Sequence, residues 1–224
     1  MSDGEGCAGC DNAHHEDSGE TATQVWERLY TERDQRWSGR PNQRLVEVAG
    51  DLPLGRALDL GCGEGGDAVW LAKQGWAVTA VDVSPTALGR LSAQAEAEGV
   101  ADRIDTVLMD LATEFPDMPE GGWDLVSAQF FQSTIAFPRT AILRRGAAAV
   151  ARGGLLLVVE HGDGHSSSNH HDVVFPTLEE TLAELALPSG EWMPVRVDRS
   201  TREAGGPDGQ SLDFVDNVIA LRRA

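Results

Sequence analysis

The chain has 224 residues, 41% of them hydrophobic, which is enough to bury one full core, so one domain is the default expectation. Its formal net charge at pH 7 is −18, and such a surface repels phosphate backbones and anionic lipids. No apolar run approaches the ~18–20 residues of a membrane span, and the first residues lack the basic and apolar regions of a signal peptide. We therefore expect a cytoplasmic protein, monomeric or homodimeric, that acts on a small molecule and not on nucleic acid or a membrane.

Residues 1–20 are polar and contain six acidic residues without a Lys or Arg, which predicts a disordered acidic tail. Cys7 and Cys10 form a Cys-x-x-Cys pair in this tail, followed by His14 and His15. A metal site or a redox pair is one interpretation. The spacing is short for a zinc module, however, and no strand or helix pattern surrounds it, so the tail interpretation is favoured and no metal is predicted. In a reducing compartment the remaining cysteine, Cys62, is expected as a free thiol.

Residues 21–52 predict a helical cap. Apolar residues at helical spacing predict a first helix over residues 23–35, and a second is expected over residues 42–49. The segment Trp-Ser-Gly-Arg-Pro-Asn at residues 37–42 separates them.

Residues 53–224 alternate between strand and helix patterns and predict a Rossmann-like core. The expected parallel strands cover residues 56–60, 76–83, 104–109, 123–128 and 155–160. The expected helices cover residues 67–74, 84–98, 138–151 and 177–187. A turn-rich stretch joins two last strands at residues 194–199 and 216–222, which favours an antiparallel hairpin. Five βα-type units and a hairpin predict the α/β class: a doubly wound, seven-stranded, mostly parallel sheet with an antiparallel C-terminal hairpin and a helical N-terminal cap.

The most informative segment is residues 57–66, Ala-Leu-Asp-Leu-Gly-Cys-Gly-Glu-Gly-Gly, between a predicted strand and a predicted helix. Glycines at this spacing let the backbone turn tightly and approach a ligand where a side chain would clash. Their position at a helix N-terminus predicts a nucleotide-type pocket. Gly61, Gly63 and Gly66 fit the dinucleotide pattern G-x-G-x-x-G, in which Asp82 would hold the ribose of a nicotinamide cofactor.

A second pattern, D-x-G-x-G-x-G, is formed by Asp59, Gly61, Gly63 and Gly65. It resembles motif I of the class I S-adenosylmethionine-dependent methyltransferases. A carboxylate at Asp59 favours a cofactor with a cationic amino-acid end and would repel a pyrophosphate. An acid at the end of the third strand and the C-terminal hairpin also match the family. The resemblance covers residues 21–224 and makes S-adenosyl-L-methionine the expected cofactor.

The resemblance implies roles for single residues. The glycines lie under the methionine and ribose parts, Asp59 interacts with the methionine ammonium, and Asp82 accepts hydrogen bonds from both ribose hydroxyls. Asp110 accepts a hydrogen bond from the adenine amino group, with the backbone of Leu111 near it. Turn chemistry at strand ends is the structural alternative for both acids.

The predicted helical cap indicates which group within the methyltransferase family the chain resembles. Tyr30 and the segment at residues 37–42 resemble the cap of the tellurite-resistance and thiopurine S-methyltransferase-like small-molecule enzymes. By that likeness Trp37 and Arg40 contact the cofactor. Alternatively, Trp37 only packs the cap and Arg40 pairs with a surface acid. No substrate motif of either enzyme can be aligned, so neither substrate carries over.

The acceptor end of the pocket should collect residues that follow the fourth and fifth strands. Gln129, Phe130 and Phe131 follow the fourth strand and suit an uncharged or aromatic small molecule; Gln129 is also assigned to the cofactor. Four histidines lie between residues 161 and 171, and they supply a base, metal ligands or only a polar lid. Because His161 directly follows a buried strand, it is the candidate catalytic base.

The sequence therefore predicts methyl transfer from S-adenosylmethionine to a small molecule, with a thiol or another soft nucleophile favoured over a hydroxyl. The alternatives are an NAD(P)-dependent oxidoreductase and a non-catalytic S-adenosylmethionine-binding module. Nucleic-acid methylation is a weaker option, because Ala-Gln-Phe-Phe stands after the fourth strand where an Asn/Asp-Pro-Pro-aromatic signature would be expected.

Overall fold

The computed structural model describes residues 21–133, 137–162, 175–205 and 211–224, the last two ranges without the side chains of 203–205 and 211–213. The acidic tail with Cys7 and Cys10, and the histidines at positions 165, 170 and 171, lie outside the described residues.

Seven strands form one sheet in the order β3-β2-β1-β4-β5-β7-β6. They are β1 (Arg56–Leu60), β2 (Ala77–Asp82), β3 (Ile104–Leu108), β4 (Trp123–Gln129), β5 (Val150–His161), β6 (Trp192–Gly205) and β7 (Ser211–Arg223). Strands β1 to β5 pair in parallel, whereas β7 is antiparallel to both β5 and β6. The strand order reverses beside β1, which is where open α/β sheets bind ligands. The predicted fold class is confirmed.

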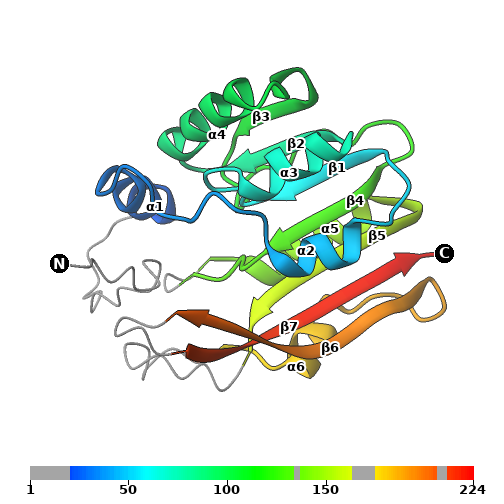
Figure 1. Cartoon of the computed structure of the whole chain (residues 1–224). Helices are drawn as coiled ribbons and strands as arrows, with labels where there is room; N and C mark the ends of the chain where they lie inside the picture. Colours follow the sequence, from blue (N-terminus) through cyan, green and yellow to red (C-terminus); the bar gives the residue numbers. More distant parts are fainter. Residues whose placement is uncertain (1–20, 134–136, 163–174, 206–210) are drawn as a thin grey trace.

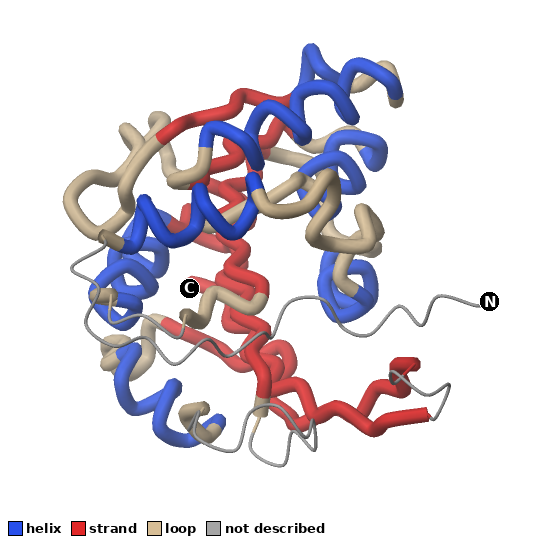
Figure 2. Tube along the Cα trace, turned by 90° about the vertical axis from the view of Figure 1, so that its left-hand side faces the viewer, coloured by secondary structure: helices blue, strands red, loops and turns tan. Residues whose placement is uncertain are grey.

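Helices cover both faces of the sheet (Figures 1 and 2). They are α1 (Ala22–Thr31), α2 (Gln43–Ala49), α3 (Gly66–Gln74), α4 (Pro85–Ala97), α5 (Arg139–Ala149) and α6 (Leu178–Leu185), with a 3₁₀ turn at Ala101–Arg103. One apolar cluster joins α2, α3 and α4 to one face, and a second joins α5 and α6 to the other. On β5, Leu155, Leu157 and Val159 belong to the first cluster, and the intervening Leu156 and Val158 belong to the second. The strand is therefore buried on both sides, as its continuous apolar run predicts.

The first cap helix is shorter than predicted. It ends at Thr31 and not at Gln35, because the backbone N–H groups of Arg36 and Trp37 bind the Glu64 carboxylate and do not continue the helix. A capping box between Thr21 and Gln24 fixes its start.

Three predictions about the core were also wrong in detail. The third βα unit has no helix, since residues 109–122 form turns and loops that include two prolines. Helix α5 ends at Ala149 and not at 151, and β5 begins at Val150, which turns to an extended conformation and pairs with Trp123. Strand β6 extends over Trp192–Gly205 because β7 offers a partner along its whole length.

No helix within the described ranges is long and apolar enough to cross a membrane.

Candidate functional site

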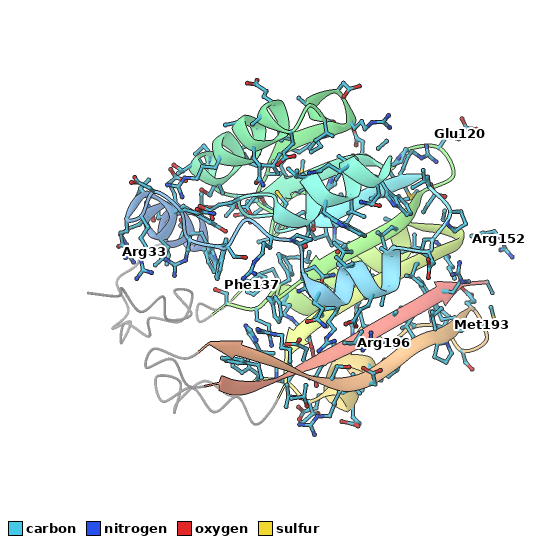
Figure 3. The ribbon with its side chains drawn as sticks, viewed as in Figure 1. Arg33, Glu120, Phe137, Arg152, Met193 and Arg196 are labelled. Carbon is cyan, nitrogen blue, oxygen red and sulfur yellow. The ribbon has the colours of Figure 1, made fainter. Side chains whose placement is uncertain are left out.

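The candidate site lies at the edge where the parallel strands end. Figure 3 marks this edge with Arg33 and Phe137, whereas Glu120, Arg152 and Met193 mark the opposite edge. The glycine loop after β1, the acids after β2 and β3, the cap, and the segments after β4 and β5 all meet at the first edge (Figure 1).

The glycine loop needs its glycines. Gly61, Gly63 and Gly65 have φ values of +70°, +54° and +86°, a region that side chains disfavour. The N–H groups of Gly61 and Cys62 both donate to the Val81 carbonyl at 2.9 and 3.0 Å, which fastens the loop to β2. A Cβ on Gly61 would lie 2.6 Å from Phe131, and one on Gly63 would lie 2.9 Å from the Tyr30 hydroxyl. The loop is therefore closely covered by the cap and by the segment after β4.

Three acidic side chains gather beneath this loop. Asp82 is 7% exposed and accepts hydrogen bonds from the N–H groups of Gly63 and Ser84 at 2.8 and 2.9 Å. Asp67, in the first turn of α3, accepts one from the Asn42 N–H. Burial raises the pKa of all three carboxyls: that of Asp67 to about 6, that of Asp82, and that of Asp59 well above its usual range. The negative charges of Asp67 and Asp82 add to the shift at Asp59.

Among the buried acceptors without a hydrogen-bond donor in the described part of the chain, two stand on the neighbouring strands β1 and β4. Asp59 is 2% exposed, and its Oδ2 accepts no hydrogen bond; the Oε1 of Gln129 is likewise unpartnered. The Gln129 amide nitrogen donates to Ser127, which pairs with Asp59 across β1 and β4. Because alternate residues of a strand share a face, Asp59 and Gln129 lie on the α3 face together. A ligand that brings a cationic donor would satisfy both, which fits the ammonium of the expected cofactor.

The third acid lies beyond its strand. β3 ends at Leu108, and Asp110 stands in the following turn, where its carboxylate accepts the Ala112 N–H at 2.9 Å. Leu111 is 6% exposed and packs in the α5 and α6 cluster. The structure brings both to the carboxyl edge, and the role of each toward adenine stays a prediction.

The cap residue Trp37 lies over the glycine loop. Its Nε1 donates to the Tyr30 hydroxyl at 3.1 Å, and it is the neighbour, at 3.5 Å, of a Cβ built on Gly63. The side chain is 39% exposed, which leaves one part of the ring open. Arg40 is exposed, and its carbonyl lies against Gly66. Contact of either residue with a cofactor stays a prediction.

Sequence reasoning missed Glu64, which stands inside the glycine loop and is 6% exposed. Its carboxylate accepts hydrogen bonds from the N–H groups of Arg36 and Trp37 at 2.8–3.1 Å. It also forms an ion pair of 2.6 Å with Arg90 of α4, which donates in turn to the Tyr30 carbonyl. Glu64 therefore ties the cap, the loop and α4 together. The sequence pattern carried no signal for this role, because Arg36, Trp37 and Arg90 lie outside the glycine motif.

The segments after β4 and β5 meet through Gln132 and His161. The Gln132 amide oxygen accepts the His161 N–H at 2.8 Å, and its nitrogen donates to the His161 carbonyl at 3.4 Å. The His161 ring stacks on Phe130 at 4.3 Å between centroids and lies 5.5 Å from the ring of Phe175. His161 is thus held at the edge where β4 and β5 end, and its role toward an acceptor stays a prediction. Among the described residues, no group of three or more His, Cys, Asp or Glu side chains is arranged to hold a metal ion.

The hairpin adds an arginine that the sequence did not single out. Arg202 of β6 donates from Nε to both oxygens of the fully buried Asp216 at 3.0 and 3.1 Å. Its guanidinium lies 5.5 Å from the ring centroid of Phe130 and 4.8 Å from that of Phe214.

The sheet order, the glycine loop and the acids at the ends of β1 and β2 are those of a class I methyltransferase fold. Residues 57–154 match the family model described as a methyltransferase domain. A ribosomal RNA small subunit methyltransferase C from Alcanivorax borkumensis is 42% identical over 50 residues, which are 22% of this chain and only 15% of that relative.

Solved structures share the fold. One, reported for the conversion of a disulfide bond into a thioacetal group during echinomycin biosynthesis, has a TM-score of 0.67 and 24% identity, covering 90% of this chain and 92% of the other. TehB from Haemophilus influenzae has a TM-score of 0.65 and 19% identity, and the match covers 88% of this chain and 67% of TehB. A magnesium protoporphyrin IX methyltransferase from Synechocystis, with bound S-adenosylmethionine, has a TM-score of 0.55 and 17% identity, covering 90% and 79%.

The match of residues 57–154 and the shared fold confirm the sequence-based recognition of a class I S-adenosylmethionine-dependent methyltransferase that resembles TehB. S-adenosylmethionine, the predicted cofactor, is the one this family uses.

Proposed function

We propose that this protein transfers a methyl group from S-adenosylmethionine to a small-molecule acceptor. The observation that carries the proposal is the pair of buried acceptors without a donor, Asp59 Oδ2 and Gln129 Oε1, beside a positive-φ glycine loop. The cofactor supplies a methyl group on a cationic sulfur. The buried carboxyls of Asp59, Asp67 and Asp82 near the glycine loop favour a cation and disfavour the pyrophosphate of NAD.

The protein's own residues bind the cofactor and orient it. Asp59 and Gln129 take the amino-acid end, Asp82 the ribose, and Asp110 with the Leu111 backbone the adenine. Trp37 and Arg40 cover the pocket from the cap. Methyl transfer is an in-line displacement, so the protein mainly has to hold the acceptor at a near-attack distance of ~3–3.5 Å and exclude water. Phe130 and Phe131 supply an apolar wall for that purpose.

We favour a thiol or another soft nucleophile over a hydroxyl as the acceptor, because such a nucleophile needs less help from a base. His161 is the candidate to assist deprotonation, and its ring is oriented by the stack on Phe130. The test is the pH dependence of kcat for His161→Ala on an accepted substrate. A loss of kcat that is largest near neutral pH, where a free imidazole is unprotonated and a free thiol is still protonated, supports the role. An unchanged kcat at every pH removes it.

A panel of small thiols, phenols and amines, assayed for S-adenosylhomocysteine formation, tests the proposed activity. Turnover of a small acceptor, abolished in Asp59→Asn, is expected. Cofactor binding without turnover of any acceptor favours the alternative of a non-catalytic binding module. Turnover of ribosomal or transfer RNA in preference to every small molecule would contradict the acceptor class. The net charge of −18 argues against that outcome.

A further inference from the structure

One cation stands at the acceptor end of the site without an assigned role. Arg202 of β6 pairs with Phe214 of β7, close to the pair formed by His161 and Asp216. The registers place Arg202, Asp216 and His161 on the same face of the sheet. Phe130 and Phe214 both lie against the guanidinium, at 5.5 and 4.8 Å, so its plane is held by aromatic rings.

Among the described residues, Arg202 pairs with one carboxylate, that of Asp216, and does so through its Nε. Asp216 is fully buried and binds the Nε of Arg202, and the Nε of Arg44 lies 3.4 Å from the same carboxylate. Arg44 also pairs with Glu47 at 2.9 Å, so its charge does not depend on Asp216 alone. The two terminal nitrogens of Arg202 donate to no residue within the described ranges, and the side chain remains 23% exposed. A planar pair of donors is thus presented at the surface of the site.

The position of Arg202 relates it to the acceptor and not to the cofactor. Phe130, on which the guanidinium lies, stacks with His161 and is followed directly by Phe131. Phe131 in turn covers Gly61 of the cofactor loop. Phe130 therefore lies against Arg202, and the next residue along the chain lies against the glycine loop.

We propose that Arg202 binds a carboxylate of the acceptor, whose apolar body lies beside Phe130 and His161. The inference rests on the proposed methyl transfer and specifies its substrate class. Guanidinium and carboxylate groups match as two parallel hydrogen bonds, and stacking on the rings has already restricted the arginine. In a chain with net charge −18, an anionic acceptor needs such a local cation to approach the site.

The test uses two thiols that differ only in the carboxylate. Protein saturated with S-adenosylhomocysteine is titrated by calorimetry with thiophenol and with 3-mercaptobenzoate. We expect the mercaptobenzoate to bind about 10-fold more tightly, the size of one charge-assisted contact. Arg202→Met should remove this preference and leave thiophenol binding unchanged, and Arg202→Lys should retain part of it.

Arg199→Gln is the matched control, since it removes the same charge from an exposed position three residues earlier on β6. Equal affinity for the two thiols, no binding of the mercaptobenzoate, or a preference that persists in Arg202→Met overturns the inference. If Arg202→Met fails to fold, Arg202→Lys decides, because it keeps a charge beside Asp216 and loses only the planar fork. Failure of the wild type to bind S-adenosylhomocysteine overturns the proposed function itself, whereas binding without a carboxylate preference overturns only the substrate class.

Discussion

Replacing Glu64 by alanine should loosen the cap over the glycine loop and weaken cofactor binding. The change removes the acceptor of two backbone N–H groups, those of Arg36 and Trp37, and the partner of the Arg90 guanidinium. Hydrogen bonds to a charged group contribute about 1.5–3 kcal/mol each, but contacts that share one carboxylate do not add, and the N–H groups can reach water once the cap opens. We therefore expect closure of the cap to lose about 2 kcal/mol, equivalent to about 30-fold in affinity if only the closed form binds.

The assay is calorimetry with S-adenosylhomocysteine, together with hydrogen exchange at the Arg36 and Trp37 amides. Exchange should accelerate at these amides while the core strands stay protected, which separates a loosened cap from general unfolding. Arg90→Met, which leaves the two backbone contacts, should have a smaller effect. Glu98→Ala is the control because it breaks an exposed ion pair with Lys73. Affinity of Glu64→Ala within about twofold of the wild type, with unchanged exchange at both amides, would refute the reasoning.

The acid cluster predicts that stability depends on pH. Burial raises the pKa of Asp59 and Asp67 above their values in the unfolded chain, so the folded protein binds more protons than the unfolded chain does. The free energy of unfolding should therefore fall as the pH rises from about 4. Urea denaturation should show a shallower fall in Asp59→Asn than in the wild type, and parallel curves would contradict this. Gly63→Ala should weaken S-adenosylhomocysteine binding by about 10-fold or more, since its Cβ would lie 2.9 Å from the Tyr30 hydroxyl. Gly99→Ala is the control: Gly99 also has a positive φ, +69°, but a Cβ there meets no neighbour, so binding should be unchanged. Equal affinities of these two variants would rule out the steric explanation. Trp37→Phe keeps an aromatic ring and removes one hydrogen bond. It should lower the binding free energy of S-adenosylhomocysteine by about 1 kcal/mol or less, measured by the same calorimetry. A complete loss of binding would mean that the indole does more than cover the loop.

The sequence predicted the sheet because its signals were local. Arg56–Leu60 is a short apolar run that ends at a glycine turn, and its predicted bounds agree with the structure. The start of α4 was equally well marked by Ser84 as cap and Pro85 in the first turn. Strand β6 was underestimated because its pairing depends on β7, and a register of that length is set by tertiary contact and not by residue pattern.

The positions of Asp59, the glycines and Asp82 at the edge of the sheet could also be predicted, since these residues lie at fixed offsets from strand ends. Glu64 and Arg202 could not. Glu64 acts on backbone groups of residues 36 and 37, which the motif does not contain. Arg202 reaches the site only because β6 folds back beside β7 and brings it to Phe130. Contacts between segments so far apart in sequence leave no periodic or motif signal.

Calorimetric titration of the purified protein with S-adenosylhomocysteine and, separately, with NAD⁺ tests the central claim most directly. The account predicts micromolar binding of S-adenosylhomocysteine, weakened by at least about 10-fold in Asp59→Asn, and no detectable binding of NAD⁺. Binding of NAD⁺ at micromolar concentration without binding of S-adenosylhomocysteine would contradict it.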